Sequence, residues 1–134
     1  MSEQHPPYGR KFLPTSERRL SEVNKNLAIV ARRAKQISRV DFEITSGLRS
    51  KDEQARLVAK GASRTMNSKH LTGHAVDVVA VLDNKKTLKS ISWSLAYYGQ
   101  IAVAFMNEAA AEGVNIEWGG NWKLVDGPHF QLND

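Results

Sequence analysis

A run of apolar residues from Ala75 to Leu82, interrupted only by Asp77, most constrains the fold of this chain. The run is apolar on both of its faces, which is typical of a strand buried inside a sheet. An ionised carboxylate in such a strand is costly unless it meets a cation, a cluster of donors or a metal ion. Asp77 therefore indicates either a structural salt bridge or a functional site.

The rest of the hydrophobic pattern predicts an α+β fold, with a small, mostly antiparallel sheet packed against helices. Apolar residues at steps of three and four predict amphipathic helices, and strict alternation predicts half-buried strands. Ser50 and Glu53 form a capping box, and Gly61 and Gly113 are helix stops. We expect helices over 16–38, 50–60 and 92–112, strands over 40–45, 75–82, 115–118 and 129–132, and a turn over 83–86.

A chain of 134 residues is long enough for one domain with its own core. The prolines Pro6, Pro7 and Pro14 suggest an extended lead-in over 1–15, followed by a single catalytic domain over 16–134. No apolar run is long enough to cross a membrane, and the N-terminus does not resemble a signal peptide. We therefore expect a monomer that is made in the cytoplasm and does not insert into membranes.

The net charge of +5 is concentrated near the N-terminus. Residues 1–39 hold nine Lys and Arg against three Asp and Glu, whereas residues 40–134 are close to neutral. This asymmetry suggests attraction to a polyanion such as an anionic cell-wall polymer, with a merely solvated helix face as the alternative. No nucleic-acid motif and no alternation of aromatic with basic residues supports a nucleic-acid partner.

The chain has no cysteine, so a metal site would have to use His, Asp or Glu. His70 lies seven residues before Asp77, and Gly73 between them allows a tight turn that would let the two side chains converge. His74 has the helical i, i+4 spacing to His70, but the segment leads into a strand and no Glu follows His70. We therefore expect His74 to lie outside the metal shell.

His129 opens the last predicted strand, three residues after Asp126. A lone His at such a position is usually a satisfied core residue, but Gly127 and Pro128 would hold it in a fixed turn with Asp126. Two histidines and one carboxylate leave the fourth position of tetrahedral zinc open to water, which is typical of a catalytic site. A nearby carboxylate could then accept the proton of that water.

Two further positions are candidates for substrate contacts. Arg49 lies between the first strand and the capped helix, where a guanidinium could bind a carboxylate or an oxyanion; the alternative is a surface arginine. Trp118 and Trp122 flank Gly119 and Gly120 and could form the wall of a groove, although tryptophans are more often core residues.

These residues together resemble the motifs of the zinc D,D-/L,D-peptidases of bacterial cell-wall metabolism. One half of the motif is Ser68, His70, Gly73, Ala75 and Asp77, and the other is Asp126 and His129. The resemblance covers nearly the whole chain and is strongest to small phage endolysins of the L-alanyl-D-glutamate endopeptidase type. It implies the hedgehog/D,D-peptidase fold.

The resemblance also implies roles for individual residues. His70, Asp77 and His129 would bind Zn²⁺, and Asp126 would be the general base. Arg49 would steady the substrate or the tetrahedral intermediate, and Ser68 would lie near the substrate; Trp118 remains a candidate from the residues alone. The implied substrate is the stem peptide of peptidoglycan, cut between L-Ala and D-Glu.

Two other functions stay open at this point. One is a D-Ala-D-Ala carboxypeptidase or dipeptidase of the same family, and the other is a non-catalytic zinc-containing module that binds the cell wall. An intact Asp126 argues against the binding module, because such a module needs no general base. The absence of a signal peptide suits a phage lysin that acts on the cell wall after its release from the host cytoplasm.

Overall fold

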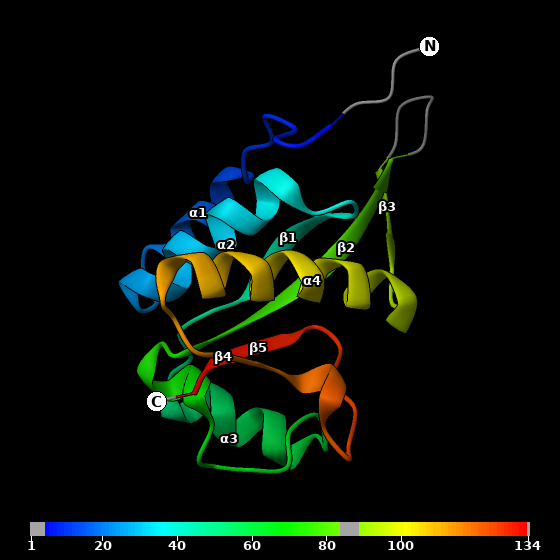
Figure 1. The fold of residues 1–134 in the computed structure, drawn as a ribbon. Helices are drawn as coiled ribbons and strands as arrows, with labels where there is room; N and C mark the ends of the chain where they lie inside the picture. Colours follow the sequence, from blue (N-terminus) through cyan, green and yellow to red (C-terminus); the bar gives the residue numbers. More distant parts are fainter. Residues whose placement is uncertain (1–4, 84–88, 134) are drawn as a thin grey trace.

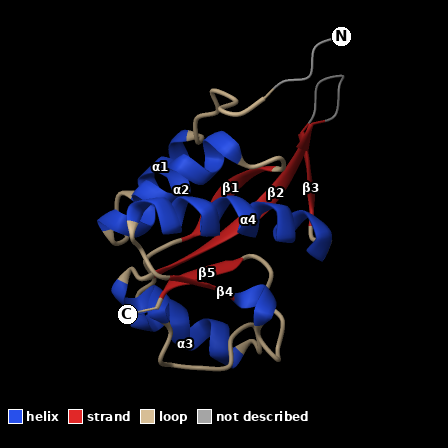
Figure 2. Cartoon of the chain, viewed as in Figure 1, coloured by secondary structure: helices blue, strands red, loops and turns tan. Residues whose placement is uncertain are grey.

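The computed structural model describes residues 5–83 and 89–133, and the predicted turn over 83–86 lies mostly outside them. These residues form a five-stranded sheet, with helices α2 and α4 side by side over one face and α3 apart from both (Figures 1 and 2). This confirms the expected α+β class. Among the described residues, no helix is long and apolar enough to span a membrane.

Strand β2 is the centre of the sheet, as its apolar sequence predicts. The strands are β1 (Asp41–Ser46), β2 (Ala75–Asp83), β3 (Lys89–Ser92), β4 (Ile116–Trp118) and β5 (His129–Leu132). One edge of β2 pairs with β1, while the other pairs first with β5 and then with β3, and every pairing is antiparallel. Strand β4 pairs with β5 at the end of the sheet.

The expected helix over 16–38 is wrong, because the structure has two helices there, α1 (Pro14–Leu20) and α2 (Lys25–Ile37). The Asn24 side chain accepts hydrogen bonds from the backbone N–H groups of Asn26 and Leu27, which starts α2 anew. The Asn24 N–H donates to the carbonyl of Gly73, 2.8 Å away. The break therefore lets the chain pack against the turn that precedes β2.

The helices α3 (Lys51–Ala59) and α4 (Leu95–Glu112) lie close to their predicted bounds. The Ser50 hydroxyl caps α3 by accepting from the Glu53 N–H, and Gly113 ends α4 with a left-handed φ of 68°. The predicted start of α4 at residue 92 is wrong, because residues 89–92 form β3. This segment becomes a strand because it pairs with the free edge of β2. Its four residues alone do not predict a strand.

The core lies between the sheet and helices α2 and α4. Three phenylalanines from different elements meet there, with Phe105 stacked on Phe130 at a ring distance of 4.0 Å and tilted against Phe42 at 5.5 Å. All three are fully buried, and burial of such rings is a main source of folding free energy. One face of β2 and β5 packs into this core. The opposite face carries Asp77 and His129, which are described below.

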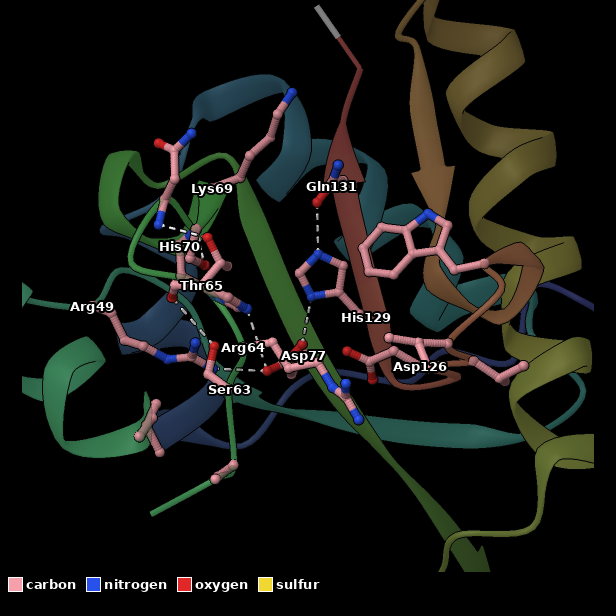
Figure 3. Close-up of a pocket in the computed structure, with 18 residues that line it drawn as sticks. Arg49, Ser63, Arg64, Thr65, Lys69, His70, Asp77, Asp126, His129 and Gln131 are labelled. Carbon is pink, nitrogen blue, oxygen red and sulfur yellow. Dashed lines mark hydrogen bonds and ion pairs between the residues drawn. The ribbon is translucent and has the colours of Figure 1, made fainter. Parts of the chain in front are cut away.

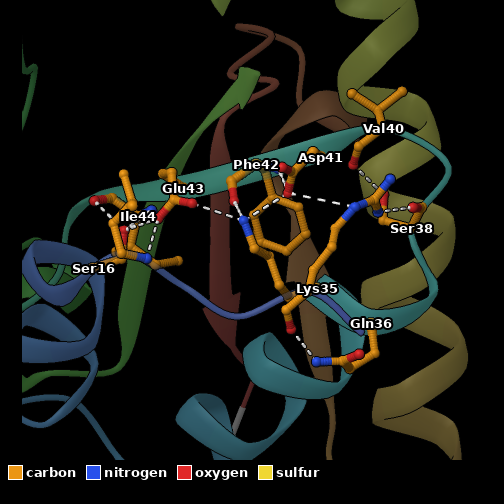
Figure 4. Close-up of polar contacts among 11 residues, drawn as sticks. Ser16, Lys35, Gln36, Ser38, Val40, Asp41, Phe42, Glu43 and Ile44 are labelled. Carbon is orange, nitrogen blue, oxygen red and sulfur yellow. Dashed lines mark hydrogen bonds and ion pairs between the residues drawn. The ribbon is translucent and has the colours of Figure 1, made fainter. Parts of the chain in front are cut away.

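Lys35 is buried, although lysine side chains are mostly exposed in proteins. Its Nζ donates to Asp41 Oδ1 at 2.6 Å, to Glu43 Oε2 at 2.7 Å and to the Phe42 carbonyl at 2.7 Å (Figure 4). The Ser16 hydroxyl donates to the other oxygen of Glu43. This ion cluster ties α1 and α2 to β1, which is the strand that leads into Arg49.

Candidate metal and catalytic site

The pairing of β2 with β5 brings two of the predicted site residues together. Asp77 of β2 lies opposite His129 of β5 in the antiparallel register, and Asp77 Oδ1 lies 3.0 Å from His129 Nδ1 (Figure 3). These residues are 52 positions apart in the chain. A change of register by one residue would turn one of the two side chains to the other face of the sheet.

His70 reaches the same point from a short 3-10 helix, η1 (Lys69–Thr72). Ser68 caps this turn by accepting from the His70 N–H, and Gly73 ends it with a left-handed φ of 73°. His70 Nε2 lies 3.3 Å from Asp77 Oδ2, the other oxygen of the carboxylate that contacts His129. The expected turn at Gly73 is confirmed, and it carries His70 toward Asp77.

Nε2 of His70 is buried and, although Asp77 Oδ2 is 3.3 Å away, makes no hydrogen bond with any residue that the structure describes, which is rare for a buried polar atom. The other nitrogen, Nδ1, lies 2.7 Å from the Gly47 carbonyl and must donate its proton to that acceptor. Nε2 therefore carries a lone pair directed into the site. Such a lone pair is what a metal ion requires of a histidine ligand.

His70, Asp77 and His129 can each offer one ligand atom, and these three atoms all lie within 4.8 Å of one another. The nitrogen and carboxylate donors, together with the unpartnered Nε2 of His70, fit a small divalent cation. His74 is not part of this group; its Nδ1 lies 2.6 Å from the Thr72 hydroxyl. The structure thus brings together the three predicted ligands and leaves out His74.

Electrostatics in the site depend on the balance between burial and ion pairing. Burial by itself would raise the pKa of Asp77, but its contacts with the imidazoles of His129 and His70 hold that pKa well below the usual value. Burial would lower the pKa of His129, but the Asp77 carboxylate raises it above the usual value. Asp77 is therefore a carboxylate at neutral pH, as a metal ligand must be.

Asp126 lies on an exposed turn beside this cluster, and its carboxylate points toward Asp77 and His129 in Figure 3. The turn is closed by the His129 N–H, which donates to the Asp126 carbonyl, and by the Asp126 N–H, which donates to Gly119. Partial desolvation of its carboxylate beside the pocket and the negative charge of Asp77 raise the pKa of Asp126 above its usual value. A carboxylate with a raised pKa is better suited to accept and return a proton.

Arg49 is not on the surface, because only 13% of its side chain is exposed. One guanidinium nitrogen donates to Asp77 Oδ2 at 3.0 Å (Figure 3). Another donates to Gln54 Oε1, also at 3.0 Å. Gln54 is fully buried and also donates to the carbonyl of Thr65. Arg49 is thereby held against the metal-ligand candidate Asp77, an arrangement that its sequence position does not reveal.

The site opens into a pocket of about 750 Å³. Arg49, Ser68, Asp126 and the three ligand candidates all line it, and Trp122 forms part of its wall, 5.0 Å from the His129 ring. Trp118 does not line the pocket. Its indole N–H donates instead to the Gly127 carbonyl at 2.7 Å, which holds the turn that carries Asp126.

Known proteins resemble this chain over most of its length. The model of the phage L-alanyl-D-glutamate peptidase family matches residues 8–132 of the chain. The chain belongs to the phage L-alanyl-D-glutamate peptidase family. Two curated proteins and a solved structure are also similar to most of this chain.

Two curated relatives carry the name L-alanyl-D-glutamate peptidase. The one from Escherichia phage T5 is 31% identical over 91% of this chain and 88% of its own length. The one from Listeria phage A118 is 37% identical over 87% of this chain, which spans only 41% of that longer relative. The crystal structure of the Serratia marcescens L-Ala D-Glu endopeptidase ChiX matches with a TM-score of 0.82 and 45% identity, covering 93% of this chain and 92% of ChiX.

Two residues of this peptidase that the sequence analysis did not single out also border the site. Gln131 lies two positions after His129, and its Oε1 is 2.9 Å from His129 Nε2. Glu117 accepts a hydrogen bond from the Gln131 amide at 3.0 Å. The available signal was the period of two in β5, which places Gln131 on the same face as His129.

Gly119 of the peptidase has no room for a side chain. A Cβ atom there would lie 2.4 Å from the Asp126 carbonyl oxygen and 3.2 Å from the His129 Cβ. We expect Gly119→Ala to displace the Asp126 turn and to lower the rate of peptidoglycan hydrolysis by at least about 10-fold, because small displacements of catalytic groups are costly. Turbidity loss of a peptidoglycan suspension measures this rate.

The matched control for that experiment is Gly99→Ala in α4. Apart from its own stretch of helix, a Cβ atom at Gly99 would have no atom of the described residues within 4 Å. Alanine also has a higher helix propensity than glycine. We expect this variant to hydrolyse at the wild-type rate. Equal rates for Gly119→Ala and the wild type would show that the close approach of Gly119 to the Asp126 turn is unimportant.

Proposed function

We propose that this peptidase is a zinc-dependent endopeptidase that cuts the bond between L-Ala and D-Glu in the stem peptides of peptidoglycan. The observation that carries the proposal is the convergence of His70, Asp77 and His129 on one point beside Asp126, within a family named for this activity. The donor set of two imidazoles and one carboxylate favours zinc over harder cations, which prefer oxygen ligands.

Zinc, when bound, supplies a Lewis acid that polarises the peptide carbonyl and makes a nearby water more acidic. In the proposed reaction the Asp126 carboxylate accepts a proton as the water attacks the carbonyl carbon of L-Ala. Asp126 then returns that proton to the nitrogen of D-Glu as the peptide bond breaks. The products are a new L-Ala carboxylate and a new D-Glu amine.

Arg49 has two tasks in this proposal. Its contact with Asp77 Oδ2 at 3.0 Å orients the carboxylate that would hold the metal. Because it also lines the pocket, its remaining N–H groups can stabilise the negative charge that develops on the carbonyl oxygen. Ser68 lines the same pocket, and its hydroxyl can contact the peptide while its oxygen caps η1.

The role of Trp118 is proposed here as support for the catalytic turn, because its indole N–H is already engaged by Gly127. Trp122 is the better candidate for contact with the peptide, since it lines the pocket next to His129. An indole ring offers a large flat surface for packing against a peptide backbone.

We further propose that the enzyme acts on the cell wall and that its basic N-terminal part is attracted to anionic wall polymers. Part of the charge there is paired, since Arg32 contacts Glu17 at 2.8 Å and Arg33 contacts Glu112 at 2.6 Å. Arg18 and Lys25 remain exposed. Such an attraction would weaken as the salt concentration rises.

The products of digestion test the proposed activity. Purified peptidoglycan is incubated with the zinc-loaded protein, and the soluble fragments are analysed by mass spectrometry. We expect fragments with new L-Ala C-termini and D-Glu N-termini. Release of free D-Ala alone would point to a carboxypeptidase, and the absence of any fragment would point to a wall-binding module.

A further inference from the structure

A row of hydrogen bonds runs from β4 across β5 to the candidate metal site. Glu117 Oε2 of β4 accepts from Gln131 Nε2 at 3.0 Å, and Gln131 Oε1 lies 2.9 Å from His129 Nε2 (Figure 3 shows the second contact). Glu117 and Gln131 are directly opposite in the antiparallel register. Both side chains are only partly exposed, so the sheet itself holds them next to each other.

The order of donors and acceptors along this row allows only one arrangement. An ionised carboxylate only accepts hydrogen bonds, so Gln131 must turn its NH₂ group toward Glu117. The carbonyl oxygen of Gln131 then faces His129 and can only accept. His129 Nε2 must therefore carry a proton and donate it to Gln131.

A neutral histidine with a proton on Nε2 has its lone pair on Nδ1. His129 Nδ1 lies 3.0 Å from Asp77 Oδ1, on the side of the metal-ligand candidates, and donates a proton to it; a bound zinc ion would take the place of that proton and use the Nδ1 lone pair. On His70 the roles are reversed, because the Gly47 carbonyl occupies Nδ1 and leaves Nε2 toward the site. His70 therefore offers Nε2 to the candidate metal position, whereas His129 offers Nδ1. The Gly47 carbonyl engages the other nitrogen of His70, and the Gln131 carbonyl engages the other nitrogen of His129.

From this geometry we propose that Gln131 and Glu117 are positioning residues that select the metal-binding tautomer of His129. Gln131 holds the proton of His129 on Nε2, and Glu117 fixes the orientation of the Gln131 amide that makes this possible. The inference rests on the proposed function, because it assumes that His129 binds zinc. It adds two residues that support the ligand from β4 and β5.

Zinc affinity, measured by competition with a chromophoric chelator, tests the inference without any assay of hydrolysis. In Gln131→Met the side chain keeps a similar length, but its sulfur is only a weak acceptor and it has no donor for Glu117. We expect its zinc affinity to fall by about 10-fold or more, which is the usual effect of losing such a supporting partner. Glu117→Gln should lower the affinity less, because Gln131 keeps its acceptor but loses its fixed orientation.

The exchanged pair Glu117→Gln with Gln131→Glu is the decisive variant. A carboxylate at position 131 accepts from His129 Nε2, and an amide at position 117 donates to that carboxylate. Both hydrogen bonds of the row are thereby restored, with the amide and the carboxylate in exchanged positions. We expect zinc affinity within about 3-fold of the wild type, since the same tautomer is selected. Loss of affinity equal to that of Gln131→Met would overturn the inference.

Gln100→Met is the matched control, because Gln100 is an exposed residue of α4, a helix of the layer over the sheet. It should bind zinc like the wild type, and thermal melting in EDTA should show that all variants fold. Wild-type affinity in Gln131→Met would overturn the positioning role while leaving the proposed function intact. A wild-type protein that binds zinc no better than His129→Ala would instead refute the metal site, and with it both proposals.

Discussion

Asp126→Ala is expected to lower the rate of peptidoglycan hydrolysis by about 100- to 10,000-fold while zinc remains bound. The range is the usual contribution of a general acid–base group to catalysis. Asp126 belongs to the pocket but not to the group of three ligand candidates, so its removal leaves those ligands in place. The loss should therefore appear in the hydrolysis rate and not in zinc affinity.

The measurement combines fragment release from purified peptidoglycan with zinc content after gel filtration. Asp126→Glu is the conservative comparison, because it keeps a carboxylate on the same turn and should retain part of the activity. The Asp126 side chain is exposed, so neither variant leaves a cavity in the core. Hydrolysis by zinc-bound Asp126→Ala at the wild-type rate would rule out Asp126 as the general base.

Asp77→Asn is expected to abolish zinc binding and hydrolysis together. Asp77 is the only carboxylate among the three candidate ligands, and it is also the partner of Arg49 and His129. An amide of the same shape supplies no negative charge to the cation. The loss of zinc affinity should exceed the 10- to 100-fold that removal of a supporting residue costs.

The same substitution should also destabilise the metal-free protein, by about 3 kcal/mol, because Arg49 is left without its carboxylate in a mostly buried position. Thermal melting in EDTA measures this effect separately from the loss of metal. Asp52→Asn, in the exposed first turn of α3, is the matched control and should change neither property appreciably. Wild-type zinc affinity in Asp77→Asn would contradict the proposed ligand set.

Asp126→Ala and Asp77→Asn are expected to differ in zinc binding because the two carboxylates lie in different surroundings. Asp77 is held between two imidazoles and a guanidinium inside the sheet, whereas Asp126 lies on an exposed turn with its carboxylate facing the same point. The first residue can hold a cation, and the second can move a proton next to it. Two carboxylates with different surroundings thus take different roles.

Much of the fold could be predicted from the sequence where the signal is local. The buried strand β2, the capped start of α3 at Ser50 and the end of α4 at Gly113 follow from hydrophobic period, hydrogen-bonding side chains and glycine conformation. The errors arose where distant contacts decide. Asn24 divides the first helix because its backbone bonds to Gly73, and residues 89–92 become β3 because β2 has a free edge.

Lys35 illustrates the same limit for a single side chain. A lysine is mostly expected in contact with solvent, but the structure buries Lys35 between Asp41 and Glu43. Its burial is possible only because those two carboxylates come from the adjacent strand. The helical period of 3.6 residues describes the faces of one helix, and it does not show which residues of a neighbouring strand lie against them.

The sequence by itself determined which residues are able to form the site. The cost of burying Asp77, the turn at Gly73 and the spacing of Asp126 and His129 are properties of neighbouring residues, and they selected the candidate ligands and excluded His74. Only the tertiary structure decided how those residues meet. The register of β2 and β5 sets His129 opposite Asp77, Arg49 is drawn onto Asp77, and Glu117 and Gln131 determine which nitrogen of His129 faces the metal position. The physical reason is that strand register and hydrogen-bond partners join residues far apart in the chain, and local sequence patterns do not encode them.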